Sequence, residues 1–283
     1  MFVIIGCLVV LASVATGYAM AGGPFSVLLV PSEYVTIGGA TIGALVISCP
    51  KKYMNVLIGS VKALFKPSPY DQNSYLELLK MLFELFSYIR KQGLLSLEKD
   101  LNDPHKSVVF SKFPTFINNH HAVEFVVDVL SFWLATNAKP HELDAYLETA
   151  METQEEEHGI VPGLVQKTGD ALPGFGIVAA VLGIVVTMQH LDGPPEELGQ
   201  HVGAALVGTF LGILAAYGFV NPMATSMELV GKDEGRYYTI IKVALLAFAE
   251  GAAPSTAVER ARKVIFSVDR MSSNDLNNEL KKK

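Results

Sequence analysis

Residues 171–222 read ALPGFGIVAAVLGIVVTMQHL (171–191), DGPPEELGQ (192–200) and HVGAALVGTFLGILAAYGFVNP (201–222). Two apolar runs in this stretch, 172–188 and 202–220, contain no Asp, Glu, Lys or Arg. A helix rises about 1.5 Å per residue, so about 20 apolar residues cross the ~30 Å hydrocarbon core of a bilayer. The segment between the runs holds two prolines and three acidic residues, including Asp192, and predicts a polar turn. The stretch therefore predicts a transmembrane helical hairpin.

Two further apolar runs lie near the N-terminus, at 2–21 and 34–49. No basic residue precedes the first run, and the run is long for the apolar part of a signal peptide, so we expect a membrane helix. The alternative is a secretory signal peptide cleaved after Ala21. Gly and Pro between the runs predict a short outer loop at 22–33, and Pro50 with two lysines ends the second helix.

The basic residues indicate which segments lie in the cytoplasm. All 22 Lys and Arg fall in 51–167 and 232–283, and none falls in 1–50 or 168–231. Basic segments next to membrane helices stay on the cytoplasmic side. Four crossings then place the N-terminus, the large loop and the C-terminus together in the cytoplasm.

The overall composition excludes several classes of protein. Half of the residues are hydrophobic and only 18% are charged, which is low for a soluble domain. The net charge of -6 argues against a nucleic-acid partner. The two cysteines, Cys7 and Cys49, lie in apolar runs without zinc-like or CxxC spacing. We therefore expect both to act as small buried residues and not to form a disulfide or a metal site.

These patterns predict an all-α integral membrane protein with four transmembrane helices and a helical cytoplasmic domain. We expect transmembrane helices 1 and 2 in residues 1–50 and a cytoplasmic helical domain in 51–170. Transmembrane helices 3 and 4 occupy 171–222, and a cytoplasmic helical tail occupies 223–283.

Within the cytoplasmic part, Ser74 and Glu77 have the spacing of a capping box at the start of a helix. A second helix is predicted across 122–138. A third begins at Pro140 and leads almost directly into the third membrane helix. Further helices are predicted up to residue 250 and over 255–268. The final residues, 272–283, are polar, and we expect disorder there.

No nucleophile–base set, phosphate loop or metal cluster is recognised, so an enzyme is the least favoured class. We expect no catalytic residue, no cofactor and no metal site. His120 and His121, with His105 and Glu124 nearby, fit no metal-ligand spacing, and we expect a loop or helix-cap role for them.

The four apolar runs lack the titratable group that a self-contained proton carrier needs. Charge within a membrane costs about 2.5–3.5 kcal/mol or more and usually marks an ion path. The polar groups in the runs are hydroxyls, and His190 and His201 are expected at the outer edges of the hairpin. Two interpretations follow: the helices are only an anchor, or they form a wall around a carboxylate that another protein supplies.

Four features, in this order, carry a resemblance to a known family. They are the order of membrane helices around one long cytoplasmic loop, the segment RKQGLLSLE at 90–98, the segment GDALPGFGIVAA at 169–180, and Asn221-Pro222. Together they resemble the MotA/TolQ/ExbB superfamily over nearly the whole chain. Within it, four rather than three membrane helices favour the MotA branch of flagellar motor stator subunits.

The resemblance implies a subunit that forms a proton-conducting complex with a MotB-like partner and converts ion flow into torque on the rotor. It implies a pentameric ring in the bacterial inner membrane, around partner helices that bear an essential Asp and are followed by a peptidoglycan-binding domain. It also implies contact with membrane lipid and with the rotor switch protein FliG, and a role in motility and chemotaxis. The alternatives are a TolQ/ExbB-like proton-driven energiser subunit and a passive membrane scaffold.

The resemblance also suggests residues of the ion path. Pro173 corresponds to a proline at the entry to the third helix, which is either a hinge or a fixed kink. Pro222 corresponds to a proline at the inner end of the fourth helix, with the same two interpretations. Thr209 corresponds to a threonine that faces the ion path. The alternative is a threonine that packs against lipid or a neighbouring helix. Sodium-driven relatives carry a threonine at the position of Ala180, so the resemblance implies proton coupling here.

Arg90 and Glu98 correspond to a charged pair that contacts the rotor. We expect both on one helix, where eight residues of separation place them about 80° apart around the axis. Both side chains then face the same partner. The alternative is that they are ordinary solvated charges.

Overall fold

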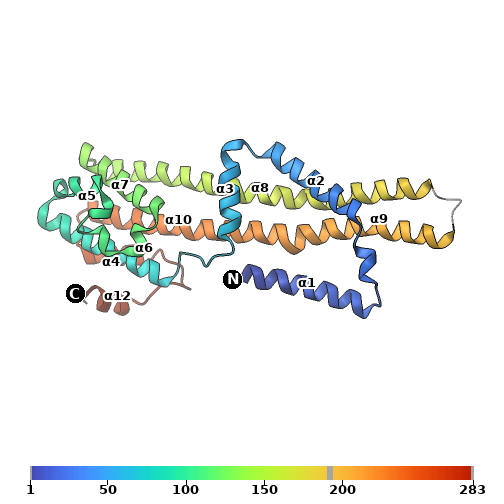
Figure 1. The fold of residues 1–283 in the computed structure, drawn as a ribbon. Helices are drawn as coiled ribbons and strands as arrows, with labels where there is room; N and C mark the ends of the chain where they lie inside the picture. The colour runs from blue at the N-terminus through green and yellow to red at the C-terminus, as the bar shows by residue number, and fades with distance from the viewer. Residues whose placement is uncertain (1, 190–193, 282–283) are drawn as a thin grey trace. The chain divides into compact units, whose positions relative to one another are not determined.

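The computed structural model describes residues 2–189 and 194–281, and all regular structure in these ranges is helical (Figure 1). His190 and Asp192, which the sequence analysis places in and beside the polar turn, lie outside the described residues. Four helical segments are long and apolar enough to cross a membrane: Phe2–Met20, Phe25–Ser48, Pro140–Met188 and Pro195–Ala249. The predicted all-α fold with four membrane helices is confirmed.

The chain forms two compact units, Met1–Pro67 with His158–Leu229 and Ser68–Glu157 with Val230–Lys283. The first unit, called the membrane unit below, contains the four candidate spans. Its elements are α1 (Phe2–Met20), η1 (Phe25–Leu28), α2 (Pro31–Ser48), α3 (Lys51–Ala63), the later part of α8 (Pro140–Met188), α9 (Pro195–Ala215), the π turn η5 (Ala216–Val220) and the start of α10 (Asn221–Ala249).

The second unit, called the polar unit below, holds the remaining elements. They are α4 (Gln72–Gln92), η2 (Leu94–Leu97), α5 (Glu98–Asn102), η3 (Pro104–Lys106), η4 (Phe110–Lys112), α6 (Pro114–Ile117), α7 (His120–Thr136), the early part of α8, the later part of α10, α11 (Pro254–Arg262) and α12 (Ser273–Lys281). The helix expected at 122–138 is confirmed as α7, and the helix from Pro140 does continue into the third membrane helix.

The second membrane helix starts earlier than predicted. The Gly and Pro residues of 22–33, including Pro31, predicted a loop there, but α2 begins at Pro31. Proline suits the first turn of a helix because its missing N–H has no partner there in any case. Glu33 therefore lies in the first turn of α2, inside a candidate span, and only 5% of it is exposed. The expectation that the membrane helices carry no acid of their own is wrong.

The start of α4 is capped differently from the prediction. The N-cap is Asp71, whose side chain accepts a hydrogen bond from the Ser74 N–H, while the Ser74 hydroxyl accepts one from the Asp71 N–H. Glu77 instead accepts hydrogen bonds from the N–H and hydroxyl of Thr115. The capping box is present, but Ser74 is its third helical residue rather than its cap.

The apolar face of α4 forms the centre of the polar unit. Leu78, Leu82 and Phe86 are fully buried at helical spacing. The Phe86 ring stacks on Phe248 of α10 with 4.5 Å between centroids. Burial of each such side chain contributes about 1.5–3 kcal/mol. The polar unit is thus an ordinary helical core built around α4.

The predicted disorder of the C-terminal residues is wrong. Residues Ser273–Lys281 form α12, and Leu276 is 1% exposed. The Ser272 hydroxyl caps the helix by accepting from the Asp275 N–H, and Glu279 pairs with Lys80 at 2.5 Å. The polar composition of the segment conceals one apolar anchor, so docking onto the core orders a helix that would be marginal alone.

The buried guanidinium of Arg262 pairs with Glu259 within α11 and ties this helix to the segment before α12. The Arg262 guanidinium donates to both carboxylate oxygens of Glu259, at 2.8 and 2.6 Å, and to the Met271 carbonyl at 2.8 Å. Only 5% of the Arg262 side chain is exposed. The hydrogen bonds from Arg262 hold the pKa of Glu259 below its ordinary value of 4.5.

We predict that Glu259→Gln destabilises residues 254–281 by about 1–3 kcal/mol at pH 7, because it leaves a buried guanidinium underbonded. A carboxyl with a depressed pKa contributes stability above its ordinary pKa and loses it as the pH falls through its folded value. The difference from wild type should therefore shrink below pH 4.5. Hydrogen–deuterium exchange of the full chain in detergent, corrected for intrinsic exchange, measures the local stability of residues 254–281 in both proteins.

The matched control is Glu250→Gln, which removes the partner of Arg260 in a pair where both side chains are more than half exposed. Exposed pairs contribute about 0–1 kcal/mol, so this variant should exchange nearly as wild type does. Equal effects of the two substitutions would contradict the structural role of the Arg262 pair.

Candidate functional site

The α8–α9 hairpin is held by direct backbone contact between glycines. A β-carbon built on Gly176 would lie 2.8 Å from the Gly208 carbonyl oxygen, and one built on Gly212 would lie 2.6 Å from the Leu172 carbonyl oxygen. Residues further along α8 meet residues earlier in α9, so the two helices are antiparallel, as predicted for a hairpin. Small residues allow this approach, and no larger residue fits.

Three of the four predicted ion-path residues gather at this contact. Pro173 and Ala180 are seven residues apart on α8, which places them within about 20° on one face. The Thr209 Cα lies 3.3 Å from the position of a β-carbon on Gly176, between them along α8. All three residues are half-buried. The hairpin therefore places the Thr209 hydroxyl residue opposite the stretch of α8 between Pro173 and Ala180.

Pro222 lies away from this group, at the second position of α10. Thirteen residues of helix separate it from Thr209, or about 20 Å. The five residues before α10 form the π turn η5. Proline cannot donate the usual helix bond and its ring crowds the preceding turn, so a wide turn directly before it relieves both constraints.

A hydrogen-bonded contact joins α8 to the start of α10 beside Pro222. The Asn221 side-chain amide donates to Asp170 at 3.0 Å, and Gln166 donates to the same oxygen at 2.9 Å. A β-carbon on Gly169 would overlap with the Asn221 side chain. In the sequence, Gly169, Asp170 and Asn221 stand out only as motif residues. Their contact was not predicted, because contact between two distant helices leaves no local sequence signal.

Arg90 and Glu98 do not share a helix, so the predicted geometry is wrong. Arg90 lies in the last turn of α4, and Glu98 begins α5. Gly93 ends α4 with φ of 84°, a left-handed value that favours glycine, and η2 separates the two helices. Both charged residues are exposed. The angle expected for one continuous helix does not apply, although both residues flank the same turn.

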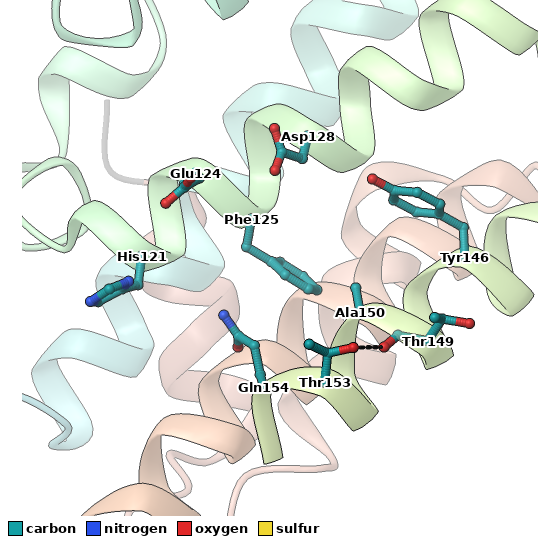
Figure 2. Close-up of a pocket in the computed structure, with 9 residues that line it drawn as sticks. All are labelled: His121, Glu124, Phe125, Asp128, Tyr146, Thr149, Ala150, Thr153 and Gln154. Atoms are coloured by element: carbon teal, nitrogen blue, oxygen red, sulfur yellow. Dashed lines mark hydrogen bonds between the residues drawn. The ribbon is translucent and has the colours of Figure 1, made fainter. Parts of the chain in front are cut away.

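The polar unit contains a pocket of about 440 Å³ between α7 and α8 (Figure 2). Its lining residues are His121, Glu124, Phe125, Asp128, Tyr146, Thr149, Ala150, Thr153 and Gln154. Burial, and to a lesser extent the neighbouring Glu124, raises the pKa of Asp128. His120 and His121 open α7 directly after its N-cap Asn119, and the rings of His105 and His120 are 6.2 Å apart. In the described ranges, no three metal-binding side chains converge.

Two family models match most of the chain. The model for the Motility protein A N-terminal region matches residues 4–93, and the model for the MotA/TolQ/ExbB proton channel family matches residues 118–235. With four candidate spans and the glycine-lined hairpin, these matches define a multi-pass membrane protein of the proton-channel type.

Curated relatives narrow this class. Motility protein A of Salmonella typhimurium is 38% identical over 96% of this chain and 92% of its own length. Motility protein A of Escherichia coli is 37% identical over the same shares, and Chemotaxis protein LafT of Vibrio parahaemolyticus is 33% identical over 92% of each. The chain belongs to the Motility protein A branch of the MotA/TolQ/ExbB proton channel family.

Solved structures share the fold. The chain aligns with "Structure of C. jejuni MotAB" at a TM-score of 0.79 and 22% identity, over 95% of this chain and 98% of that one. It aligns with "Structure of the flagellar MotAB stator complex from Bacillus subtilis" at a TM-score of 0.76 and 24% identity, over 98% of both. A TolQ/ExbB-like energiser or a passive scaffold is not favoured.

We predict that Gly176→Ala abolishes or strongly reduces motility, because the added methyl group would press on the Gly208 carbonyl and separate α8 from α9. Such overpacking costs about 1–3 kcal/mol. Gly174→Ala is the matched control, since a β-carbon at that position meets nothing within 4 Å. Soft-agar swarming of a host lacking its own subunit, with membrane immunoblots, provides the measurement. Equal swarming by the two variants would refute the glycine contact.

Proposed function

We propose that this chain is a stator subunit of the bacterial flagellar motor. With a MotB-like partner it forms a proton-conducting complex that converts ion flow into torque on the rotor. The observation that carries the proposal is the α8–α9 hairpin, which gathers Pro173, Ala180 and Thr209 in a chain of the motility-protein branch. The solved structures of similar fold are named as MotAB complexes, which supports a MotB-like partner.

The proposal includes an arrangement in the cell. The chain lies in the inner membrane with both termini in the cytoplasm, as the two blocks of basic residues favour. Residues 51–170 and 223–283 are then cytoplasmic, and 1–50 and 171–222 cross the bilayer among lipids. Five copies surround the partner's helices, and the partner supplies an Asp and a grip on peptidoglycan.

The residues of the hairpin have distinct roles in this proposal. The Thr209 hydroxyl orders water beside the partner's carboxylate, and Ala180 offers no oxygen ligand to a hard cation, which favours the proton as coupling ion. Pro173 cannot donate to the Gly169 carbonyl, so α8 is locally weakened one turn from the Gly169–Asn221 contact. Protonation near Pro173 can therefore be transmitted to Pro222 through this contact.

The energy source is the membrane potential. Each charge that crosses releases about 2.3 kcal/mol per 100 mV. No enzymatic step and no cofactor are proposed, because proton flow itself supplies the energy.

We predict that cells relying on this subunit swim in sodium-free buffer and stop when a proton uncoupler is added. The physical reason is that Ala180 cannot help to replace the hydration shell of sodium, whereas a proton needs only one acceptor. Swimming speed is measured by video tracking, with filament staining to show that the flagella remain intact. Swimming that persists unchanged with the uncoupler would refute proton coupling.

We predict that exchanging the charges at Arg90 and Glu98, as R90E/E98K, lowers swimming speed without lowering the amount of subunit in the membrane. Each exposed pair with the rotor protein FliG contributes only about 0–1 kcal/mol, so contact can form and break at every step. The matched control exchanges Lys106 and Asp103, an exposed pair elsewhere in the polar unit. Normal speed in R90E/E98K would remove the rotor-contact role.

A further inference from the structure

The membrane unit contains a buried carboxyl group in addition to the proposed ion-path residues Pro173, Ala180, Thr209 and Pro222. Glu33 is the third residue of α2, and 5% of it is exposed. It lies in the candidate span Phe25–Ser48. Burial of an acid inside a membrane span is costly, and such acids usually have a function.

Two glycines make room for this carboxyl group. A β-carbon on Gly208 of α9 would overlap with Oε2 of Glu33, and one on Gly183 of α8 would lie 3.6 Å from Oε1. Ala179 and Ala205 complete the surroundings, because their β-carbons lie close to the same two glycines. The carboxyl group thus occupies a notch, called the glycine notch below, that only these small residues leave open.

Within the described residues, Oε2 of Glu33 has no hydrogen-bond partner. No Lys or Arg occurs in residues 1–50 or 168–231, which include all of α2 and the hairpin. An ionised carboxylate without a partner in an apolar site costs several kcal/mol, whereas the protonated form is neutral. The glycine notch therefore favours a bound proton.

Titratable groups on the elements around the glycine notch are few. On α9, His201 and Glu197 share the face of Gly208 by helical spacing, on the side toward the start of the helix. On α8, no residue between Asp170 and Met188 titrates, and η1 carries no such residue. Glu33 is thus the deepest titratable group on this face, with His201 and Glu197 between it and the outer end.

The face of α2 that carries Glu33 leads toward the predicted ion path. Ile37, one turn on, packs with Leu172 and Ala179 of α8. Thr41, a further turn on, has a buried hydroxyl oxygen without a hydrogen-bond partner among the described residues. Gly208 directly precedes Thr209. The carboxyl group therefore lies beside the residue that directly precedes Thr209.

We propose that Glu33 is a proton-binding site that this chain itself contributes to the ion path, in addition to the partner's Asp. Its carboxylate takes a proton from a hydronium ion in the water at the outer side and becomes a carboxylic acid. It then gives that proton to the water that Thr209 orders beside the partner's Asp, whose carboxylate accepts it, and Glu33 returns to the carboxylate. A single carboxyl oxygen suffices for a proton, while a hard metal cation requires several oxygen ligands. The inference rests on the proposed function.

The test uses membrane vesicles that contain the chain with its MotB-like partner. Proton influx under an imposed gradient is followed with a pH-sensitive dye for wild type, Glu33→Gln and Glu33→Asp. Independently, dicyclohexylcarbodiimide, which reacts with protonated carboxyl groups in apolar sites, is applied at several pH values. Mass spectrometry then locates the adduct. The control is Glu196→Gln, at an exposed acid in the first turn of α9.

We expect Glu33→Gln to lower proton influx at least tenfold at unchanged abundance, Glu33→Asp to retain part of it, and Glu196→Gln to match wild type. Wild-type Glu33 should be labelled, with less labelling at alkaline pH. Gln fills the same volume, so a purely packing role for Glu33 predicts normal influx in Glu33→Gln, and that result would overturn the inference while leaving the proposed function intact.

Two further outcomes are decided by the labelling. If wild-type vesicles conduct no protons, the proposed function fails, and pH-dependent labelling of Glu33 still establishes a proton-binding site. If Glu33→Gln does not accumulate, the labelling of the wild-type chain decides alone. Absence of an adduct at Glu33 at every pH overturns the inference in either case.

Discussion

The membrane unit depends on one constraint, the contact of two helix backbones at Gly176, Gly208 and Gly212. Between membrane helices there is no hydrophobic driving force, so close packing itself holds the hairpin together. The contact fixes which residues of α8 face which residues of α9. It places Thr209 beside α8 between Pro173 and Ala180, and it leaves the space that Glu33 fills.

Much of the fold follows from sequence because its determinants are local. Long apolar runs predict the four spans, and the placement of basic residues predicts their connections. The glycine-rich composition of the last two spans predicts close packing, although not which glycines meet. Which glycines meet depends on how far one helix is shifted along the other, and the sequence of the joining loop does not determine that shift.

The predictions that failed concern contacts between residues far apart in the sequence, or residue types that favour different structures in different contexts. Pro31 ends helices in one context and begins them in another, so Glu33 was placed in a loop. Gly93 lies within the segment RKQGLLSLE, but its left-handed φ, which separates Arg90 from Glu98, is a property of the backbone. The ordering of α12 depends on Leu276 and on Lys80 from a segment far away in sequence. The roles of Pro173, Ala180, Thr209 and Pro222 remain proposals that the fold makes geometrically coherent.

The π turn η5 has a consequence for the register of the fourth span. A π turn accommodates one residue more than an α-turn, which offsets every later side chain by about 100° around the axis. The stripe through Gly208 and Gly212 therefore cannot be extended into α10 by counting in threes and fours. Residues that follow Asn221 point where they do because of this one extra residue. Pro222, locked directly after it, keeps the insertion from migrating along the helix.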